Sequence, residues 1–241
     1  MPHENDSKDE KPESFIWQTY LDAAKDEDAG RPKNWEGSTN GILTFTGLFA
    51  ATVAAFIVES YALLSPDSTD RTNMLLEQLF VAMANTSLNI PVVVPPMQPF
   101  SVAPTAVVIN VLWFSSLLIS LTCALLATLV QEWSRAYPQD VNRRKVLHET
   151  IQARACNHIF IRMGVDRYGM DHFVSWIVAL VHLSVLSFAC GLVIFLYDIN
   201  SIVAGMTTIM LGVFCVLYCI SSLIPLFDKS CPYRTPLSYF V

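Results

Sequence analysis

The chain has 241 residues, of which 53% are hydrophobic and only 15% are charged, and its mean hydropathy is +0.42. This composition excludes an ordinary soluble domain and a disordered chain, and it favours a membrane protein. Nucleic acid is not expected as a partner, because the chain as a whole lacks the excess of basic residues that phosphate binding uses.

Residues 1–38 form a polar, acidic N-terminal tail, in which ten of the 21 acidic residues lie before Ser38. The tail has no basic segment followed by an apolar one, so we expect no cleavable signal peptide and an uncleaved first anchor. Apolar residues recur at helical spacing between Glu13 and Asp28, which predicts a short amphipathic helix. Gly30 and Pro32 are expected to end it.

Four apolar runs follow, at about residues 41–64, 105–133, 173–197 and 202–227. At about 1.5 Å per helical residue, each run is long enough to cross the roughly 30 Å hydrocarbon core of a bilayer. We therefore expect an all-α integral membrane protein, with four transmembrane helices in a membrane domain of residues 39–228 and with amphipathic interfacial helices outside the spans.

Small residues predict how the spans pack, because they let helix backbones approach closely in lipid. The first span has Gly47, Ala51 and Ala55 four residues apart. In the second span, the expected close-packing face comprises Ser116, Ser120, Cys123, Ala124 and Ala127. A different face of that span carries Asn110, Leu117, Leu121 and Thr128. The last span carries a seam that we expect to meet another helix, in this chain or in a second copy: Gly205, Thr208, Gly212, Cys215, Cys219 and Ser222.

The connection of residues 65–104 begins with an expected amphipathic helix, Thr72–Ala84, whose apolar residues would cover the outer end of the bundle. These residues are Leu75, Leu76, Leu79, Phe80 and Met83. A proline-rich stretch then favours an extended path into the second span.

The segment of residues 134–172 holds seven of the 15 basic residues, and apolar residues recur in it every four positions. It is predicted to be a basic amphipathic helix that faces anionic lipid headgroups, and the alternative is a solvated helix docked on the bundle. The expected headgroup contacts are Arg143, Arg144, Lys145, Arg154 and Arg162. Residues 229–241 form a juxtamembrane tail, in which Cys231 is a candidate for palmitoylation.

The basic residues also predict the topology. Fourteen of the 15 lie on one side if the chain crosses four times, which by the positive-inside rule makes both termini cytoplasmic. We expect an integral protein of the endomembrane system or plasma membrane. The sequon at Asn85 then lies outside and is expected to carry a glycan, whereas the sequon at Asn5 stays cytoplasmic and silent.

Several strings together resemble a known family: GLFAATVAAFIVESYALLSPD from Gly47, VINVLWFSSLLISLTCALLATLVQEW from Val108, LVHLSVLSFACGLVIFLYDIN from Leu180 and CPYRTPLS from Cys231. They look like the fungal, chiefly basidiomycete, multi-pass membrane proteins known as domain of unknown function 6535. The resemblance covers about residues 17–238. It implies a fungal integral membrane protein, and it supplies no activity and no catalytic residues.

Three polar residues within the spans are candidates for function, because polar groups are costly in hydrocarbon. Glu59 and Asn110 fall at similar depth in neighbouring spans, so we expect a hydrogen bond between them. Glu59 is either an ion or proton site or a structural contact near the interface. His182, the deepest titratable group, is interpreted as a packing residue, with a proton relay as the alternative.

No complete catalytic motif is present, and the six cysteines have neither a disulfide framework nor a zinc-binding spacing. We therefore expect no catalytic residues, no cofactor and no metal. The leading interpretation is a non-enzymatic scaffold that packs against itself or a membrane protein partner while its basic helix meets the anionic cytoplasmic leaflet. A subunit of an oligomeric channel or transporter is the alternative, and an intramembrane enzyme comes third.

Overall fold

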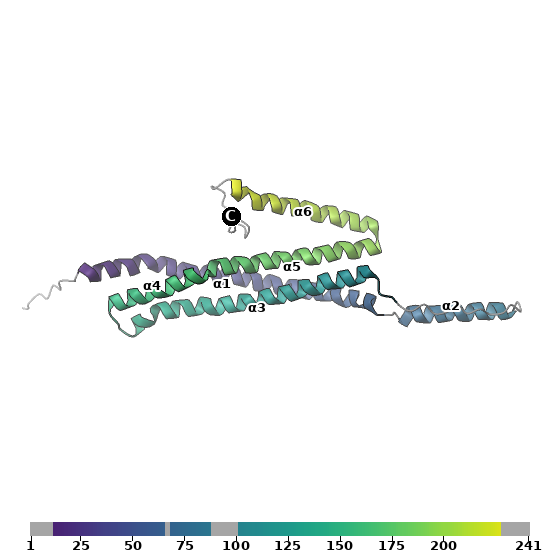
Figure 1. The fold of residues 1–241 in the computed structure, drawn as a ribbon, viewed down its shortest axis with the longest axis horizontal. Helices are drawn as coiled ribbons and strands as arrows, with labels where there is room; N and C mark the ends of the chain where they lie inside the picture. Colours follow the sequence, from purple (N-terminus) through teal and green to yellow (C-terminus); the bar gives the residue numbers. More distant parts are fainter. Residues whose placement is uncertain (1–11, 66–67, 88–100, 228–241) are drawn as a thin grey trace, which may run out of the picture.

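The computed structural model describes residues 12–65, 68–87 and 101–227, and the regular elements in these ranges are helices. Four helical stretches are long and apolar enough to cross a membrane: Ser14–Leu64, Pro104–Arg143, Ile151–Ile199 and Ser201–Ile224. The predicted fold class, an all-helical protein with four candidate spans, is thereby confirmed. Figure 1 shows an elongated bundle in which α1, α3 and α5 run side by side.

The first helix, α1 (Pro12–Tyr61), is a single helix of 50 residues that continues into a short 3-10 helix, η1 (Ala62–Leu64). The prediction that Gly30 and Pro32 end a short helix is therefore wrong. A proline inside a helix costs about 3 kcal/mol because one backbone hydrogen bond is lost. Here Pro32 is buried against α3, and its carbonyl accepts a hydrogen bond of 2.9 Å from the Ser134 hydroxyl. Tertiary packing offsets the local cost.

The third helix, α3 (Pro104–Val146), likewise runs past Trp133 and through Pro138 for 43 residues. Its buried positions alternate in steps of three and four, which is the spacing of a coiled-coil seam. They are Ala106, Ile109, Trp113, Ser116, Ser120, Cys123, Ala127, Val130, Ser134 and Tyr137, and Asn110 is buried beside Ile109. The seam crosses from the apolar run into the polar part of the helix without a break, so both parts form one rigid rod.

Helices α1 and α3 are antiparallel, because contacts near the end of one join residues near the start of the other. The Ser60 hydroxyl donates to Asn110 Oδ1 over 2.9 Å, and the Trp35 ring meets the Tyr137 ring edge-on at 5.8 Å. Buried residues of α1 recur at the same three-four spacing, apart from one step of seven that the half-buried Phe49 divides: Trp35, Thr39, Ile42, Thr46, Val53, Ile57 and Ser60. The α1–α3 pair is therefore the central packing unit of the bundle.

The predicted single basic helix of residues 134–172 is also wrong. Its first part belongs to α3, a turn follows in which His148 has a φ of 53°, and a separate helix α4 (Ile151–Tyr168) begins with Thr150 as its N-cap. Gly169, with a φ of 62°, then joins α4 to α5 (Met170–Ile199). Glycine adopts this left-handed conformation without the steric penalty of a Cβ, so α4 and α5 lie end to end (Figure 1).

The last helix, α6 (Ser201–Phe227), folds back from α5 after Asn200, whose Oδ1 accepts from the Ile202 amide over 2.9 Å. Figure 1 shows α6 diverging from α5 towards its C-terminal end. Most described side chains of α6 are exposed, and no atom lies within 4 Å of a Cβ added at Gly205 or Gly212. The predicted small-residue seam is only partly covered: Ser222 is buried, three residues are half-buried (Gly205, Thr208 and Cys215), and Gly212 and Cys219 are exposed.

The second helix, α2 (Ser68–Ser87), contains the predicted helix Thr72–Ala84. Figure 1 shows it extending away from the end of the bundle. The five apolar residues that we expected to cover that end are all exposed: Leu75, Leu76, Leu79, Phe80 and Met83. Together they form an apolar face that is exposed, and the expected cover over the bundle end is not seen among the residues that the structure describes.

The packing faces confirm one prediction and overturn another. On α3, Ser116, Ser120 and Cys123 are buried as expected. On α1, the three predicted packing residues are exposed, namely Gly47, Ala51 and Ala55. At about 100° per residue, they lie on the side of α1 opposite the buried Val53.

Close approach of helices occurs instead at Gly191 of α5. A Cβ placed there would lie 2.6 Å from Nε1 of the buried Trp113, which donates to the Phe188 carbonyl over 3.2 Å. The missing side chain is therefore what admits the indole between α3 and α5.

Candidate functional site

The most polar contacts of the bundle lie beyond the apolar runs, in a region that we call the stalk: residues 12–40 of α1, residues 131–146 of α3, and α4. The boundary is marked by a hydrogen bond of 2.6 Å from Gln131 Nε2 to Asn40 Oδ1. From Asn40 back to Pro12 the helix extends about 40 Å at 1.5 Å per residue. The stalk is therefore a substantial helical projection rather than a pair of frayed ends.

At the centre of the stalk, His158 of α4 joins residues of α1. Its Nε2 lies 2.7 Å from Oδ2 of Asp28, and its Nδ1 lies 2.8 Å from the Tyr20 hydroxyl. When Nε2–H donates to the carboxylate, the neutral ring accepts the Tyr20 proton at Nδ1. Both ring nitrogens thus have partners, and the side chain is 1% exposed. This geometry makes His158 a buried cross-link between two helices.

Tyr137 extends the network to α3, since its hydroxyl donates to Oδ1 of Asp28 over 3.0 Å. Burial raises the pKa of Tyr137 well above its ordinary value, and the hydrogen bond to Asp28 and the charge of that carboxylate raise it further. Burial also raises the pKa of Tyr20. Both phenols therefore keep their protons at neutral pH and remain hydrogen-bond donors to the His158–Asp28 pair.

Ion pairs join α1 to α4 on the outside of the stalk. Arg31 lies 2.9 Å from Asp166 and 3.3 Å from Glu27, and Arg162 lies 2.6 Å from the second oxygen of Glu27. Single exposed pairs contribute about 0–1 kcal/mol each, so their role is to fix the register of the helices rather than to hold the fold.

A further contact couples the stalk to the candidate spans. The indole of Trp35, which is 3% exposed, donates to Oδ1 of Asp171 over 2.6 Å. Asp171 lies in the first turn of α5, where a negative charge is favoured by the helix dipole. This bond ties α1 to the point where α4 passes into α5.

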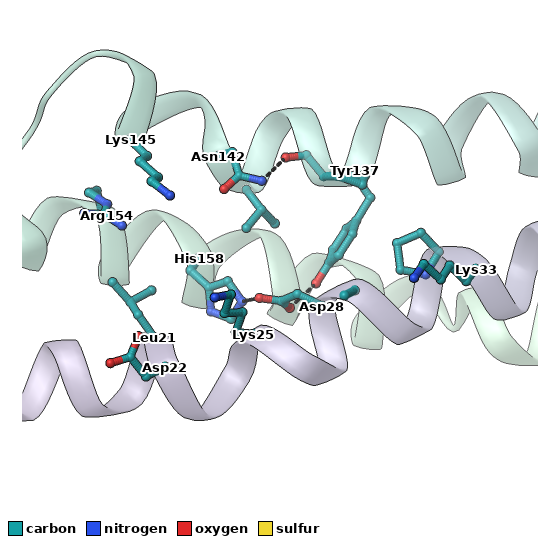
Figure 2. A pocket seen from close by; sticks show the side chains of 14 residues that line it. Leu21, Asp22, Lys25, Asp28, Lys33, Tyr137, Asn142, Lys145, Arg154 and His158 are labelled. Carbon is teal, nitrogen blue, oxygen red and sulfur yellow. Dashed lines mark hydrogen bonds and ion pairs between the residues drawn. The ribbon is translucent and has the colours of Figure 1, made fainter.

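A groove of ≈ 520 Å³ opens beside this network, between α1, α3 and α4. Figure 2 shows His158 and Asp28 along its wall and the cationic side chains of Lys145 and Arg154 at one end. Apolar residues such as Leu21, Pro32 and Val141 complete the lining. The groove therefore combines positive charge with an apolar surface, which suits a small anionic molecule with some organic character.

The predicted intramembrane residues Asn110 and His182 both form hydrogen bonds, and the partner of Asn110 is not the expected one. Asn110 accepts from Ser60 and not from Glu59; its Nδ2 donates to the Ala106 carbonyl over 2.9 Å. Glu59 is exposed, one position away on the helix. His182 has Nδ1 2.7 Å from the Val178 carbonyl, and its ring lies 5.2 Å from that of Tyr218 on α6. The expected bond between Glu59 and Asn110 is thus replaced by a bond from the neighbouring serine.

The predicted headgroup contacts lie along the stalk. Arg143 is ten residues beyond Trp133, or about 15 Å at 1.5 Å per residue, whereas the headgroup layer on one side of a bilayer is roughly 5–8 Å thick. Arg162 pairs with Glu27, and Lys145 and Arg154 line the groove. Contact with headgroups stays a prediction. Cys231 and the side chains of Asn85 and Arg144 lie outside the described residues.

The sequence interpretation missed the network of Tyr20, Asp28, Tyr137 and His158. One signal was present: the three-four spacing of the α1 seam continues backwards from Ser60 through Trp35 to Pro32 and Asp28. A polar residue at a seam position predicts a buried partner, because an unpaired one is costly. The identity of that partner, 130 positions away, had no local signal.

One comparison with known proteins gives a match. A model of a family of unknown function, DUF6535, matches residues 17–198, which include α1 to α5 except at their ends. No curated protein and no solved structure matches the chain. Because the match covers more than half of the sequence, this protein belongs to the family of unknown function DUF6535.

Proposed function

We propose that this protein is a non-enzymatic structural or interaction protein of a membrane, which assembles with further copies of itself through α1. The observation that carries the proposal is the small-residue face of α1. Gly47, Ala51 and Ala55 are exposed along a candidate span, while Val53 and Ile57 on the opposite side are buried in the bundle. Helix association in lipid depends on close backbone approach at small residues, so this face suits the same face of a second copy.

The stalk supports an interaction role of a second kind. Its helices continue rigidly from the candidate spans, and the His158–Asp28 cross-link and the Trp35–Asp171 bond hold them together. A projection built in this way keeps a fixed orientation relative to the membrane. In our proposal it presents a defined surface to a membrane protein partner, and its basic residues are attracted by the anionic leaflet.

The proposed topology places the stalk in the cytoplasm. Its support is the distribution of charge, with fourteen of 15 basic residues on the stalk side of the spans or in the terminal tails. The residence in the endomembrane system or plasma membrane and the glycan on Asn85 follow from this topology. The resemblance described above supports a fungal origin.

Native mass in mild detergent tests the assembly. Wild-type protein is expected to run as an oligomer, and the double variant Ala51→Leu/Ala55→Leu as a monomer, because the added side chains separate the helices. The matched control is Cys190→Leu, which enlarges an exposed small residue of α5 and should leave the mass unchanged. A monomeric wild type, or an oligomer that the double variant leaves intact, would refute assembly through this face.

A channel subunit is the second candidate, and one observation favours it. Glu59, Thr44 and Thr52 are exposed on the same side of α1 as the small residues. An oligomer closed on this side would gather copies of Glu59 around its axis, and rings of carboxylates are typical of cation channels. Cation flux into vesicles containing the wild type, abolished by Glu59→Gln but not by His182→Ala, would support this function over the scaffold. Equal flux from wild type and Glu59→Gln would show that Glu59 does not line a cation pathway, and it would refute this candidate function.

A further inference from the structure

We propose that the stalk groove between α1, α3 and α4 is a binding site for a small anion that carries two or more phosphate groups. The groove lies within a single chain, so this inference does not depend on assembly through α1. Its volume of ≈ 520 Å³ falls in the range of about 300–1,000 Å³ that is usual for sites of small organic ligands.

The positive charge of the groove comes from three helices. Lys25 and Lys33 belong to α1, Lys145 to α3 and Arg154 to α4, and all four side chains line the groove. Figure 2 shows Lys145 and Arg154 towards one end of the groove, with Lys25 and Lys33 at successive positions along α1. Charges distributed in this way match a ligand with separated anionic groups better than a single small ion.

These four cations have no ion-pair partner among the residues that the structure describes. The other cations of the stalk interface differ, since Arg31 and Arg162 are both paired with carboxylates of Glu27 or Asp166. The arginines on the outer face of the stalk are thus paired, whereas the described cations of the groove form no direct ion pair.

The carboxylates in the groove do not change this balance. Asp28 already accepts hydrogen bonds from Tyr137 and His158, and Asp22 is the other acidic residue of the lining. Two carboxylates against four cations leave a positive excess beside a partly apolar surface. Lysine side chains bind phosphate as mobile point charges, and the guanidinium of Arg154 can bind two phosphate oxygens at once.

Two sources could supply such a ligand, namely a soluble polyphosphate compound and a polyphosphorylated lipid headgroup. Lys33, the groove cation on α1 nearest to the span, is seven residues from Asn40 and thus about 10 Å beyond the boundary. Lys25 is about 22 Å beyond it. Most of the groove therefore lies past the headgroup layer, a position that a soluble compound reaches more easily.

The test uses the full chain in phosphatidylcholine nanodiscs at low salt, with inorganic tripolyphosphate as the soluble probe. We expect saturable binding by calorimetry and a rise in the melting temperature. The variant Lys25→Gln/Lys145→Gln/Arg154→Gln should weaken binding at least tenfold. Arg143→Gln is the matched control, because Arg143 is an exposed cation of α3 outside the groove lining and only two positions from Lys145.

A second set of nanodiscs contains phosphatidylinositol bisphosphate and no soluble probe. Binding of tripolyphosphate in phosphatidylcholine discs supports the soluble source. A rise in melting temperature confined to the second set and absent in the triple variant supports the headgroup. The proposal is overturned if neither set shows an effect, or if Arg143→Gln weakens binding as much as the groove variant does. Circular dichroism of the triple variant verifies that it is folded, so that lost binding reports on the groove.

Discussion

The imidazole of His158 lies 2.7 Å from the carboxylate of Asp28, although the two residues are 130 positions apart in the chain. This contact ties α4 to α1 in the middle of the stalk, and the Tyr137 hydroxyl ties α3 to the same carboxylate. A bundle whose helices extend beyond the spans needs such contacts, because helices outside the bilayer are held together only by contacts with one another.

Removal of this cross-link should loosen the stalk selectively. His158→Ala leaves Asp28 and Tyr20 without their partner and opens a cavity, which together should lower the free energy of unfolding by about 2–4 kcal/mol. Hydrogen exchange is expected to accelerate in α4 and the first part of α1, with little change in the candidate spans. Cys156→Ala changes an exposed side chain of the same helix and provides the control. Uniform acceleration along the whole chain would contradict a local cross-link.

Tyr137 should ionise at a higher pH than an ordinary tyrosine. Its pKa in the folded protein is raised above the ordinary value of 10.0, so the folded state holds its proton where the unfolded state releases it. The resulting contribution to stability is complete below about pH 10 and is lost as the pH rises towards the folded-state pKa. In a pH titration followed by ultraviolet absorbance, part of the phenolate signal should therefore develop only well above pH 10, and we call this part the high-pH component.

The variant Tyr137→Phe should lack part of that high-pH component. The control is Tyr168→Phe, which removes a phenol that is 85% exposed. If Tyr137→Phe reduced only the phenolate signal that develops near the ordinary pKa of 10.0, the burial and hydrogen bonding described for this phenol would not hold in solution.

The contact between Gly191 and Trp113 predicts an unusual effect of alanine. Alanine at position 191 would place a Cβ 2.6 Å from the indole nitrogen, which forces α3 and α5 apart and should cost about 1–3 kcal/mol. Gly212→Ala in α6 meets no atom within 4 Å and should raise stability slightly through helix propensity. Melting temperatures in detergent distinguish the two. Equal effects would mean that the interface tolerates the extra carbon.

The sequence predicted the candidate spans well because an uncharged run of that length has few structural alternatives. It failed where packing overrides a local signal: Gly30 and Pro32 were expected to end a helix, yet both lie inside α1. Burial of Pro32 against Ser134 supplies the compensation, and only the folded structure contains that contact.

Side-chain partners were predicted less well than helices, for a geometric reason. Adjacent residues on a helix point about 100° apart, so an error of one position moves a side chain to another face. Glu59 was expected to bond Asn110, but its neighbour Ser60 does so. Likewise, a small residue in a span indicates a close helix contact but not which helix makes it. Gly191 contacts Trp113 of the same chain, whereas Gly47 is exposed on the surface of the bundle.

The proposed topology predicts a glycan on Asn85 when the protein is expressed in a eukaryotic host. Treatment with a glycosidase should then shift the apparent mass of wild type and not of Asn85→Gln. Asn5→Gln is the matched control, since its sequon belongs to the terminal tail on the opposite side in this topology. A glycan that Asn5→Gln removes would invert the assignment of the two sides.

Assembly through the outward face of α1 is the central claim, and site-specific photo-crosslinking in native membranes tests it most directly. A photoreactive amino acid at position 51 should yield a covalent dimer of the chain. The same group at position 118, on an exposed face of α3, should yield none. A dimer from position 118 alone, or no dimer from position 51, would contradict the account.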